Sequence, residues 1–265
     1  YYDHNMLVMS ERISDHLPKT QKYLPKQRLW YIRANEVLIS SGSIERPLVF
    51  GNNDTPGVML SSAAKEYMKV YGVLVGKKPL IFTNNDSGYE TAIEFKKNGV
   101  NPIILDTRSD PSSDIIAEAK NLNIEIKFSH VVVAAKGYKK VKSADIAKIS
   151  DDKKELFNIE NIECDCICVS GFWTPSIHLA SQSGNKSKFN KKIDAFVPDK
   201  SKQKENTIGS ANGIFTLEET IKDAFDKGFD VSNKITEKNI KVSAPTVVEK
   251  KSTEHDKFWC VPLPK

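Results

Sequence analysis

The stretch FTNNDSGYETAIEFKKNGVNPIILDTR, residues 82–108, has the outline of a βαβ unit. It ends one apolar run, turns through small polar residues, follows a helical pattern to Gly99 and enters a second apolar run that closes with Asp106. This order is typical of nucleotide-binding proteins, in which the first turn carries a G-x-G-x-x-G pattern and an acid about 20 residues later binds ribose. The stretch therefore predicts an α/β fold.

The turn itself keeps only one of the three glycines of that pattern. Thr83 and Asn85 stand at the first two positions, and Gly88 stands at the third. The third glycine lets the helix pack on the strand, whereas the second lets backbone approach a pyrophosphate. Asn85 would project toward the phosphate, and Asp86 would add negative charge there. The residues leave a dinucleotide site and a structural scaffold as alternatives, and the missing second glycine favours the scaffold.

The surrounding sequence alternates strand and helix patterns. Residues 28–42 predict a β meander that feeds a buried strand, and residues 61–71 predict a helix. Further strands are expected at 124–128, at 131–135 and within 161–171. Strands that alternate with helices around one sheet indicate mainly parallel order.

The last clear helix begins at Thr216, with Glu219 three residues later as its capping-box partner. Gly228 is expected to end it. Beyond residue 232 the sequence carries charge and proline without a period, which predicts a linker over 232–265.

Composition sets limits on the class of protein. The chain has 265 residues, 39% of them hydrophobic, and no run of 18 or more apolar residues. Its first residues, YYDHNMLVMS, resemble no signal peptide and include no initiator Met, so we expect a piece of a longer cytoplasmic protein. The net charge of +5 comes almost entirely from lysine, because 39 Lys+Arg minus five Arg leaves 34 Lys. Phosphate and guanine recognition favour arginine, so nucleic acid is not an expected partner.

Neither cysteine nor histidine is patterned for chemistry. Cys164, Cys166 and Cys168 alternate at strand spacing, which predicts reduced thiols on one buried face and no metal site. The histidines have no carboxylate or cysteine partner at a recognisable spacing, so we assign no catalytic residue; they are His4, His16, His130, His178 and His255.

Two other turns could present backbone to an anion. Gly42 follows an apolar strand and lies between Ser41 and Ser43. The second turn, at residues 209–213, opens the last helix, and its residues are Gly209, Ser210, Ala211, Asn212 and Gly213. Glycine permits close approach, and a helix N-terminus favours negative charge. A well-capped helix without a ligand is the alternative.

Four segments together resemble the α subunit of heterotetrameric sarcosine oxidases. They are IRANEVLISSGSIERPLVFGNNDTPGVML, GKKPLIFTNNDSGYETA, CDCICVSGFWTPSIHLASQSG and GSANGIFTLEETIKDAF. The resemblance covers most of residues 1–231. It implies a nested pair of Rossmann-like units with disulfide-reductase-like architecture, truncated at both ends. Residues 1–75 would begin the first unit, 76–165 the inserted second unit and 166–231 the return, with 232–265 leading toward a folate-binding domain.

The resemblance also implies where a nucleotide binds. It associates NAD with Ser41, Gly42 and Ser43 and with Gly209, Ala211, Asn212 and Gly213, and it leaves the turn at 84–87 as a scaffold or subunit contact. The sequence departs from the family pattern at two places: serines precede Gly42 where the family has Ala-Thr, and Phe172 replaces a common glycine.

The implied activity is oxidative demethylation of sarcosine to glycine by a complex with β, γ and δ subunits. FMN, FAD and tetrahydrofolate would serve the whole complex, and this chain alone would be inactive. Two alternatives stay open: a stand-alone NAD(P)- or FAD-dependent oxidoreductase, and a structural subunit without a ligand.

Overall fold

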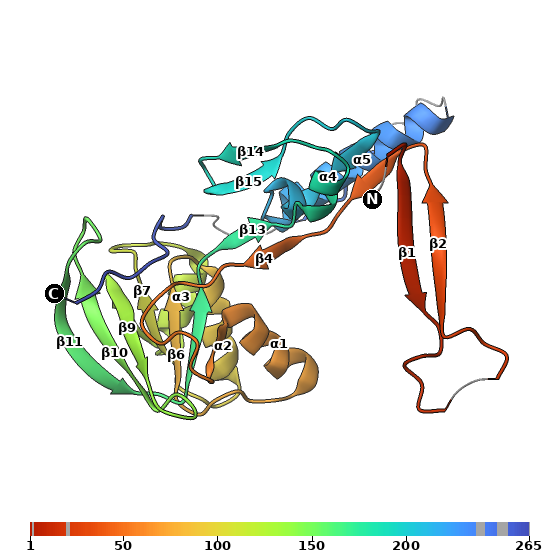
Figure 1. Cartoon of the computed structure of the whole chain (residues 1–265). Helices are drawn as coiled ribbons and strands as arrows, with labels where there is room; N and C mark the ends of the chain where they lie inside the picture. The colour runs from red at the N-terminus through yellow and green to blue at the C-terminus, as the bar shows by residue number, and fades with distance from the viewer. Residues whose placement is uncertain (2, 20–21, 237–241, 248–253, 265) are drawn as a thin grey trace. The chain divides into compact units, whose positions relative to one another are not determined.

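The computed structural model describes residues 1, 3–19, 22–236, 242–247 and 254–264. They form two compact units, each built from two separate stretches of chain (Figure 1). Unit 1 contains Tyr1–Ile44 and the described part of Thr174–Glu249, and unit 2 contains Glu45–Trp173 and residues 254–264. The chain passes between the units at β4 (Ser43–Glu45) and β13 (Trp173–Pro175), which pair with each other.

Unit 2 is built on a five-stranded sheet of order β5-β12-β6-β7-β8, and each of its neighbouring pairs is parallel. This confirms the predicted α/β fold with a parallel sheet. The register pairs Thr83 with both Ser170 and Asp106, so three neighbouring strands end level. The strands are β5 (Val58–Leu60), β6 (Pro79–Thr83), β7 (Ile103–Asp106), β8 (Glu125–Phe128) and β12 (Cys166–Ser170).

Two apolar cores cover the two faces of this sheet. Helices α1 (Ser61–Tyr71), α2 (Ser87–Lys97) and α3 (Asp114–Asn121) pack on one face. A three-stranded antiparallel sheet packs on the other; its strands are β9 (His130–Lys136), β10 (Ser143–Ile149) and β11 (Leu156–Glu163).

The cysteines show which side chains of β12 face which core. Cys166 and Cys168 lie in the helix-side core, and Ile167 lies in the other. Cys164 also lies in that other core, so the prediction that all three thiols share a face is wrong. Cys164 precedes the strand, where the two-residue alternation does not apply.

Unit 1 contains short strand pairs and one long helix. Its one parallel pair among the described residues joins β3 (Val37–Ile39) to β16 (Glu205–Thr207). The other elements are the hairpin of β1 (Met6–Arg12) and β2 (Gln27–Arg33), α4 (His178–Gln182), the hairpin of β14 (Ser187–Asn190) and β15 (Ala195–Pro198), the 3₁₀ turn η1 (Gly209–Asn212) and α5 (Leu217–Thr236). None of the described helices has the length and apolar character needed to cross a membrane.

The start of α5 matches its sequence signal, but its end does not. The Thr216 hydroxyl bonds the Glu219 carboxylate at 2.7 Å and accepts the Glu219 amide at 3.3 Å, which confirms the capping box. The helix continues through Gly228 to Thr236, so the expected end at Gly228 is wrong. A glycine inside a helix costs only about 1 kcal/mol, which the surrounding turns can offset.

The predicted domain limits also differ from the observed packing. The second unit was expected at 76–165, whereas its compact form begins at Glu45 and reaches Trp173. The predicted linker at 232–265 lies partly in residues 237–241 and 248–253, outside the described part. Residues 254–264 are not a linker, because Phe258 and Val261 lie buried in the core of unit 2.

Candidate functional site

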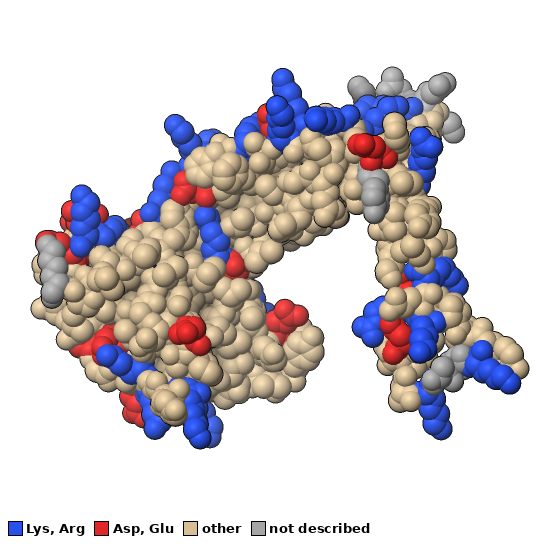
Figure 2. Space-filling model, in the orientation of Figure 1, with Lys and Arg blue, Asp and Glu red and all other residues tan. Residues whose placement is uncertain are grey.

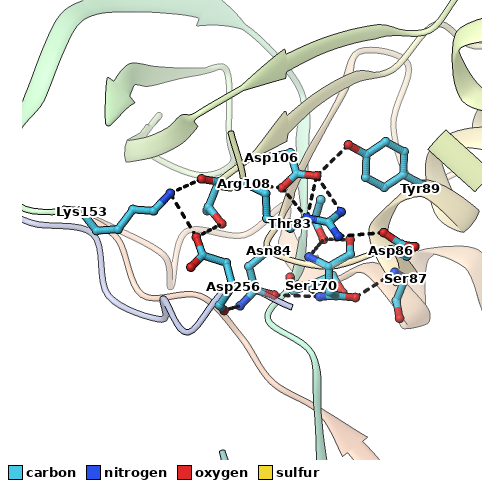
Figure 3. A network of polar contacts seen from close by, with 12 residues as sticks. Thr83, Asn84, Asp86, Ser87, Tyr89, Asp106, Arg108, Lys153, Ser170 and Asp256 are labelled. Atoms are coloured by element: carbon cyan, nitrogen blue, oxygen red, sulfur yellow. Dashed lines mark hydrogen bonds and ion pairs between the residues drawn. The ribbon is translucent and has the colours of Figure 1, made fainter. Parts of the chain in front are cut away.

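The carboxyl ends of β6, β7 and β12 form the edge of unit 2 at which open α/β sheets bind ligands. Polar side chains gather there, and Figure 3 shows how they point toward one another. Thr83, Asn84, Asn85, Asp106 and Ser170 are almost completely buried. We call this group the polar edge.

In the turn after β6, the side chain of Asn85 bonds to the first amide of α2 and to the end of β12. The Ser87 amide, the first of α2, donates to Asn85 Oδ1 at 2.8 Å, and Asn85 Nδ2 donates to the Ser170 carbonyl at 3.1 Å. A Cβ on Gly88 would lie 2.6 Å from Thr83 Cβ, which confirms the close helix–strand packing expected of the third glycine. The turn therefore keeps its packing glycine and uses a helix amide internally.

Arg108 links two buried carboxylates behind this turn. Its guanidinium lies 2.9 Å from Asp86 and 2.8 Å from Asp106, and the three side chains are 12%, 4% and 0% exposed. The Tyr89 hydroxyl also donates to Asp106 at 2.7 Å. Burial, and next the charge of Asp106, raise the pKa of Tyr89 well above its usual range. Burial disfavours the charged form of Arg108, but Asp106 and Asp86 outweigh it and raise its pKa.

Residues 254–264, which we call the strap, cross the polar edge. Asn84 Nδ2 donates to the carbonyls of Asp256 at 2.9 Å and Phe258 at 3.1 Å, and the Asp256 amide donates back to the Asn84 carbonyl at 2.9 Å. The Asp256 carboxylate accepts the Thr107 hydroxyl at 2.9 Å and lies 3.1 Å from Lys153 Nζ (Figure 3).

Aromatic rings extend the strap over the end of β12. The His255 ring stacks on Phe172 with centroids 4.0 Å apart and planes 8° apart, and Trp259 Nε1 donates to the Gly171 carbonyl at 3.0 Å. Phe172 has a φ of 72°, in the left-handed region that glycine favours. Phenylalanine thus keeps the glycine-like backbone of the related pattern and adds a ring on which the strap rests.

Glu45 is a third buried acid at this end of unit 2, besides Asp86 and Asp106, and it was not predicted. Its Oε2 accepts the Ser62 amide at 2.8 Å, in the first turn of α1. Glu45 Oε1 and Ser61 Oγ are buried and have no hydrogen-bond partner among the described residues. Burial raises the pKa of Glu45, although hydrogen bonds from Ser62 and Ser170 oppose the shift. Glu45 is the last residue of the short strand β4, and no sequence pattern marked it.

The residues predicted to bind NAD all lie in unit 1, where β3 and β16 bring the two turns to the same end. The pair is parallel, and the Ile208 amide continues it by donating to the Ile39 carbonyl at 3.0 Å. Gly42 has a φ of 76° and open space where a side chain would lie. Ser41 Oγ donates to the Ser176 carbonyl at 2.6 Å, and Ser43 begins β4.

In the second predicted turn, at residues 209–213, protein groups already take up the backbone amide and the space beside the glycines. The Gly209 amide donates to the Asp223 carboxylate at 2.8 Å, and Ala211 is buried. Gly213 has a φ of 81°, and a Cβ there would lie 2.8 Å from Ile193 and 2.9 Å from Val197. Its close approach is therefore to apolar side chains of its own unit, and Asn212 stays half-buried beside it. Binding by these residues stays a prediction.

Thr207, the last residue of β16, was not predicted. Its hydroxyl is buried and has no hydrogen-bond partner in the described structure. It stands at the end of the parallel pair from which both predicted turns begin. A threonine before a glycine-rich turn was the only sequence signal for it.

The other titratable groups that the structure describes form no catalytic arrangement. His130 Nδ1 lies 2.6 Å from the Phe128 carbonyl, and His178 Nδ1 lies 3.2 Å from Ser176 Oγ. Burial raises the pKa of Cys164 to about 12, which makes its thiol unreactive. No cluster of His, Cys, Asp or Glu within the described ranges could hold a metal ion. Figure 2 shows Lys and Arg interspersed with Asp and Glu on the visible face.

Comparison with curated proteins finds relatives that share one description, sarcosine oxidase subunit alpha. No protein-family model matches the chain. It is 33% identical over 217 residues to sarcosine oxidase subunit alpha of Corynebacterium sp. (strain P-1), an alignment that covers 81% of this chain and 22% of the relative. The same subunit of Rhizobium meliloti (strain 1021) is 35% identical over 198 residues, which are 74% of this chain and 19% of the relative. The chain thus spans about a fifth of the length of these relatives.

A solved structure supports the fold. Thioredoxin reductase from T. acidophilum aligns with a TM-score of 0.57 at 18% identity, over 76% of this chain and 66% of that one. At this identity the likeness shows the fold alone, and it confirms the predicted disulfide-reductase-like architecture.

Proposed function

Because the chain belongs to the sarcosine oxidase α-subunit family, we propose that it is the nucleotide-binding and assembly region of such a subunit, with NAD bound to unit 1. One observation carries the choice of unit: Gly42 has open space just beyond the carboxyl ends of the parallel strands β3 and β16, whereas the strap covers the corresponding edge of unit 2. Ligands of open α/β sheets bind beyond the carboxyl ends of parallel strands.

The residues of unit 1 fit a dinucleotide in three respects. Gly42 leaves open space beside left-handed backbone, so a pyrophosphate could approach the chain there. The buried Thr207 hydroxyl has no hydrogen-bond partner among the residues that the structure describes, and a ligand hydroxyl or phosphate would provide one. Asn212 offers an amide at the neighbouring turn. The Gly209 amide already donates to the Asp223 carboxylate. The remaining polar contacts with NAD would therefore come from Ser41, Ser43 and Ala211.

Unit 2 fits a dinucleotide poorly. The helix amide that would face a phosphate donates to Asn85, Arg108 is held by two carboxylates, and the strap covers the ends of β6, β7 and β12. This supports the interpretation of the turn at 84–87 as a scaffold.

The wider activity follows the family. We place this region in a complex that demethylates sarcosine to glycine oxidatively, with FMN, FAD and tetrahydrofolate bound elsewhere in the complex and β, γ and δ subunits as partners. NAD, when bound, supplies hydride chemistry. The residues of this chain would bind and orient it, and we assign them no step of the demethylation.

A stand-alone reductase is the weaker alternative. Disulfide reductases use an accessible thiol pair, whereas Cys164, Cys166 and Cys168 are buried in the two cores. A structural subunit without a ligand is the other alternative, and binding experiments distinguish it.

The test compares two glycines with the same geometry. Gly42 and Gly72 both have positive φ, 76° and 61°, and both have open space for a side chain. Valine at either site costs similar backbone strain, but Gly72 ends α1 in unit 2. We expect Gly42→Val, in the whole enzyme complex, to weaken NAD binding at least tenfold by calorimetry, and Gly72→Val to change it less than twofold.

Two results would contradict the proposal. If wild-type complex neither retains nor binds NAD, unit 1 is structural. If Gly42→Val and Gly72→Val weaken binding equally, the site is not at Gly42.

A further inference from the structure

Unit 1 contains a cavity of about 640 Å³ that the proposed function does not use. Its walls come from residues 3–5, 33–35 and 202–204. Asn35 lies just before β3 and Lys204 just before β16, so the cavity is at the amino ends of the parallel pair. The NAD site proposed above lies at the carboxyl ends, about 10 Å away along three-residue strands.

The charge of the lining is strongly positive. Arg33, Lys202 and Lys204 contribute three cations, and Asp3 contributes the one carboxylate among the lining residues. With His4 neutral, three positive charges minus one negative charge leave +2. In the described part of the chain, none of these three cationic side chains has an ion pair or a hydrogen bond. Like charges held together without partners repel each other, and a bound anion would relieve that repulsion.

A buried residue holds the three wall segments in place. Asn5 is 5% exposed, and its amide donates to Gln203 Oε1 at 2.7 Å. Its side-chain Nδ2 donates to the Lys204 carbonyl at 3.0 Å and the Asn35 carbonyl at 3.4 Å. These bonds use the side-chain oxygen of Gln203 and the backbone carbonyls of Asn35 and Lys204, so none of them involves a charged side chain of the lining.

The backbone of the first wall segment is strained. His4 and Asn5 have φ values of 62° and 52°, so two successive residues other than glycine adopt the left-handed region. Such residues cost free energy and cluster where ligands are clamped. Here the strain is kept by the hydrogen bonds of Asn5.

We infer that this cavity binds the phosphate group of a small molecule. An arginine fork and two ammonium groups suit a compact oxyanion, and a charge of +2 balances a dianion. Ala34 is the one apolar side chain of the lining, so the walls favour a charged group over a carbon skeleton. The same charges would accept a dicarboxylate more weakly, because its two carboxylates are separated.

Calorimetry tests the site by measuring the affinity for inorganic pyrophosphate and, in a parallel titration, for the dicarboxylate succinate. The variant Arg33→Gln/Lys202→Gln/Lys204→Gln removes the three cations and keeps the backbone bonds. The matched control Lys186→Gln/Lys192→Gln/Lys222→Gln removes three exposed cations of unit 1 outside the cavity. We expect wild-type protein to bind pyrophosphate more tightly than succinate. The cavity variant should lose at least tenfold, and the control should stay within twofold.

The result is separable from NAD binding. The cavity variant should keep wild-type NAD affinity, because the cavity lies at the amino ends of the parallel pair and Gly42 follows its carboxyl end. No binding of pyrophosphate by wild-type protein, an equal loss in both variants, or tighter binding of succinate would each overturn the inference.

Discussion

Replacement of Arg108 by methionine should destabilise unit 2 more than any change of a surface charge. The variant removes a guanidinium that is 12% exposed and leaves Asp86 and Asp106, 4% and 0% exposed, without it. Removal of one partner from a buried ion pair costs about 3–5 kcal/mol, since a buried charge loses its compensation. Tyr89 and the Arg108 amide still donate to Asp106, which favours the lower end, about 3 kcal/mol.

Urea unfolding followed by tryptophan fluorescence measures this effect. Trp173 and Trp259 report on unit 2, because Trp173 Nε1 donates to Ser87 Oγ at 3.0 Å and Trp259 bonds Gly171. The control is Lys97→Met, which breaks the exposed pair with Glu118 and should cost less than about 1 kcal/mol. A loss for Arg108→Met no larger than that of the control would refute the view that Arg108 neutralises buried carboxylates.

Three further outcomes are expected. Glu45→Gln should be more stable than wild-type protein at pH 8, and the difference should shrink as the pH falls toward 4.5. The reason is that the pKa of Glu45 is raised, so the folded wild-type protein loses stability as this carboxyl ionises; a difference that does not change with pH would contradict the raised pKa. Gly213→Val should lower the stability of unit 1 by about 1–3 kcal/mol in thermal unfolding, since its side chain would overlap Ile193 and Val197, and an unchanged melting temperature would contradict the packing. A thiol reagent should modify Cys260 quickly because this thiol is exposed, and it should modify the buried Cys164, Cys166 and Cys168 only when the protein unfolds. Rapid reaction of more than one thiol would show that the cores open in the folded protein.

The parts of the fold that sequence predicted depend on local patterns. Residues 82–108 gave the correct strand, helix and strand because apolar periodicity is a short-range signal. Gly88 kept its packing role, and Thr216 with Glu219 formed the expected capping box. Each of these features is determined within a few residues of chain.

The parts that sequence missed depend on distant residues. The strap belongs to the segment 232–265, which the sequence predicts to be a linker. Only the folded structure shows that Phe258 is buried in the core of unit 2. Glu45 is buried beside the amide of Ser62, which lies 17 residues away in the chain and donates to its carboxylate. Thr207 had only a weak signal, its place before a glycine-rich turn, because sequence does not show that its hydroxyl is buried without a hydrogen-bond partner among the described residues.

The strap also fixes the order in which the chain can finish folding during synthesis. Asn84 bonds to strap carbonyls 172 and 174 residues further along, and the stretch from Thr174 to Thr236 of unit 1 is made in between. The ribosome therefore supplies every described strand and helix of unit 1 before it supplies the residues that close unit 2. Until then the amide of Asn84 and the hydroxyl of Thr107 must bond to water. Pulse proteolysis of released chains that end after residue 240 should find unit 1 resistant and unit 2 cleavable, and equal resistance would show that unit 2 closes without the strap.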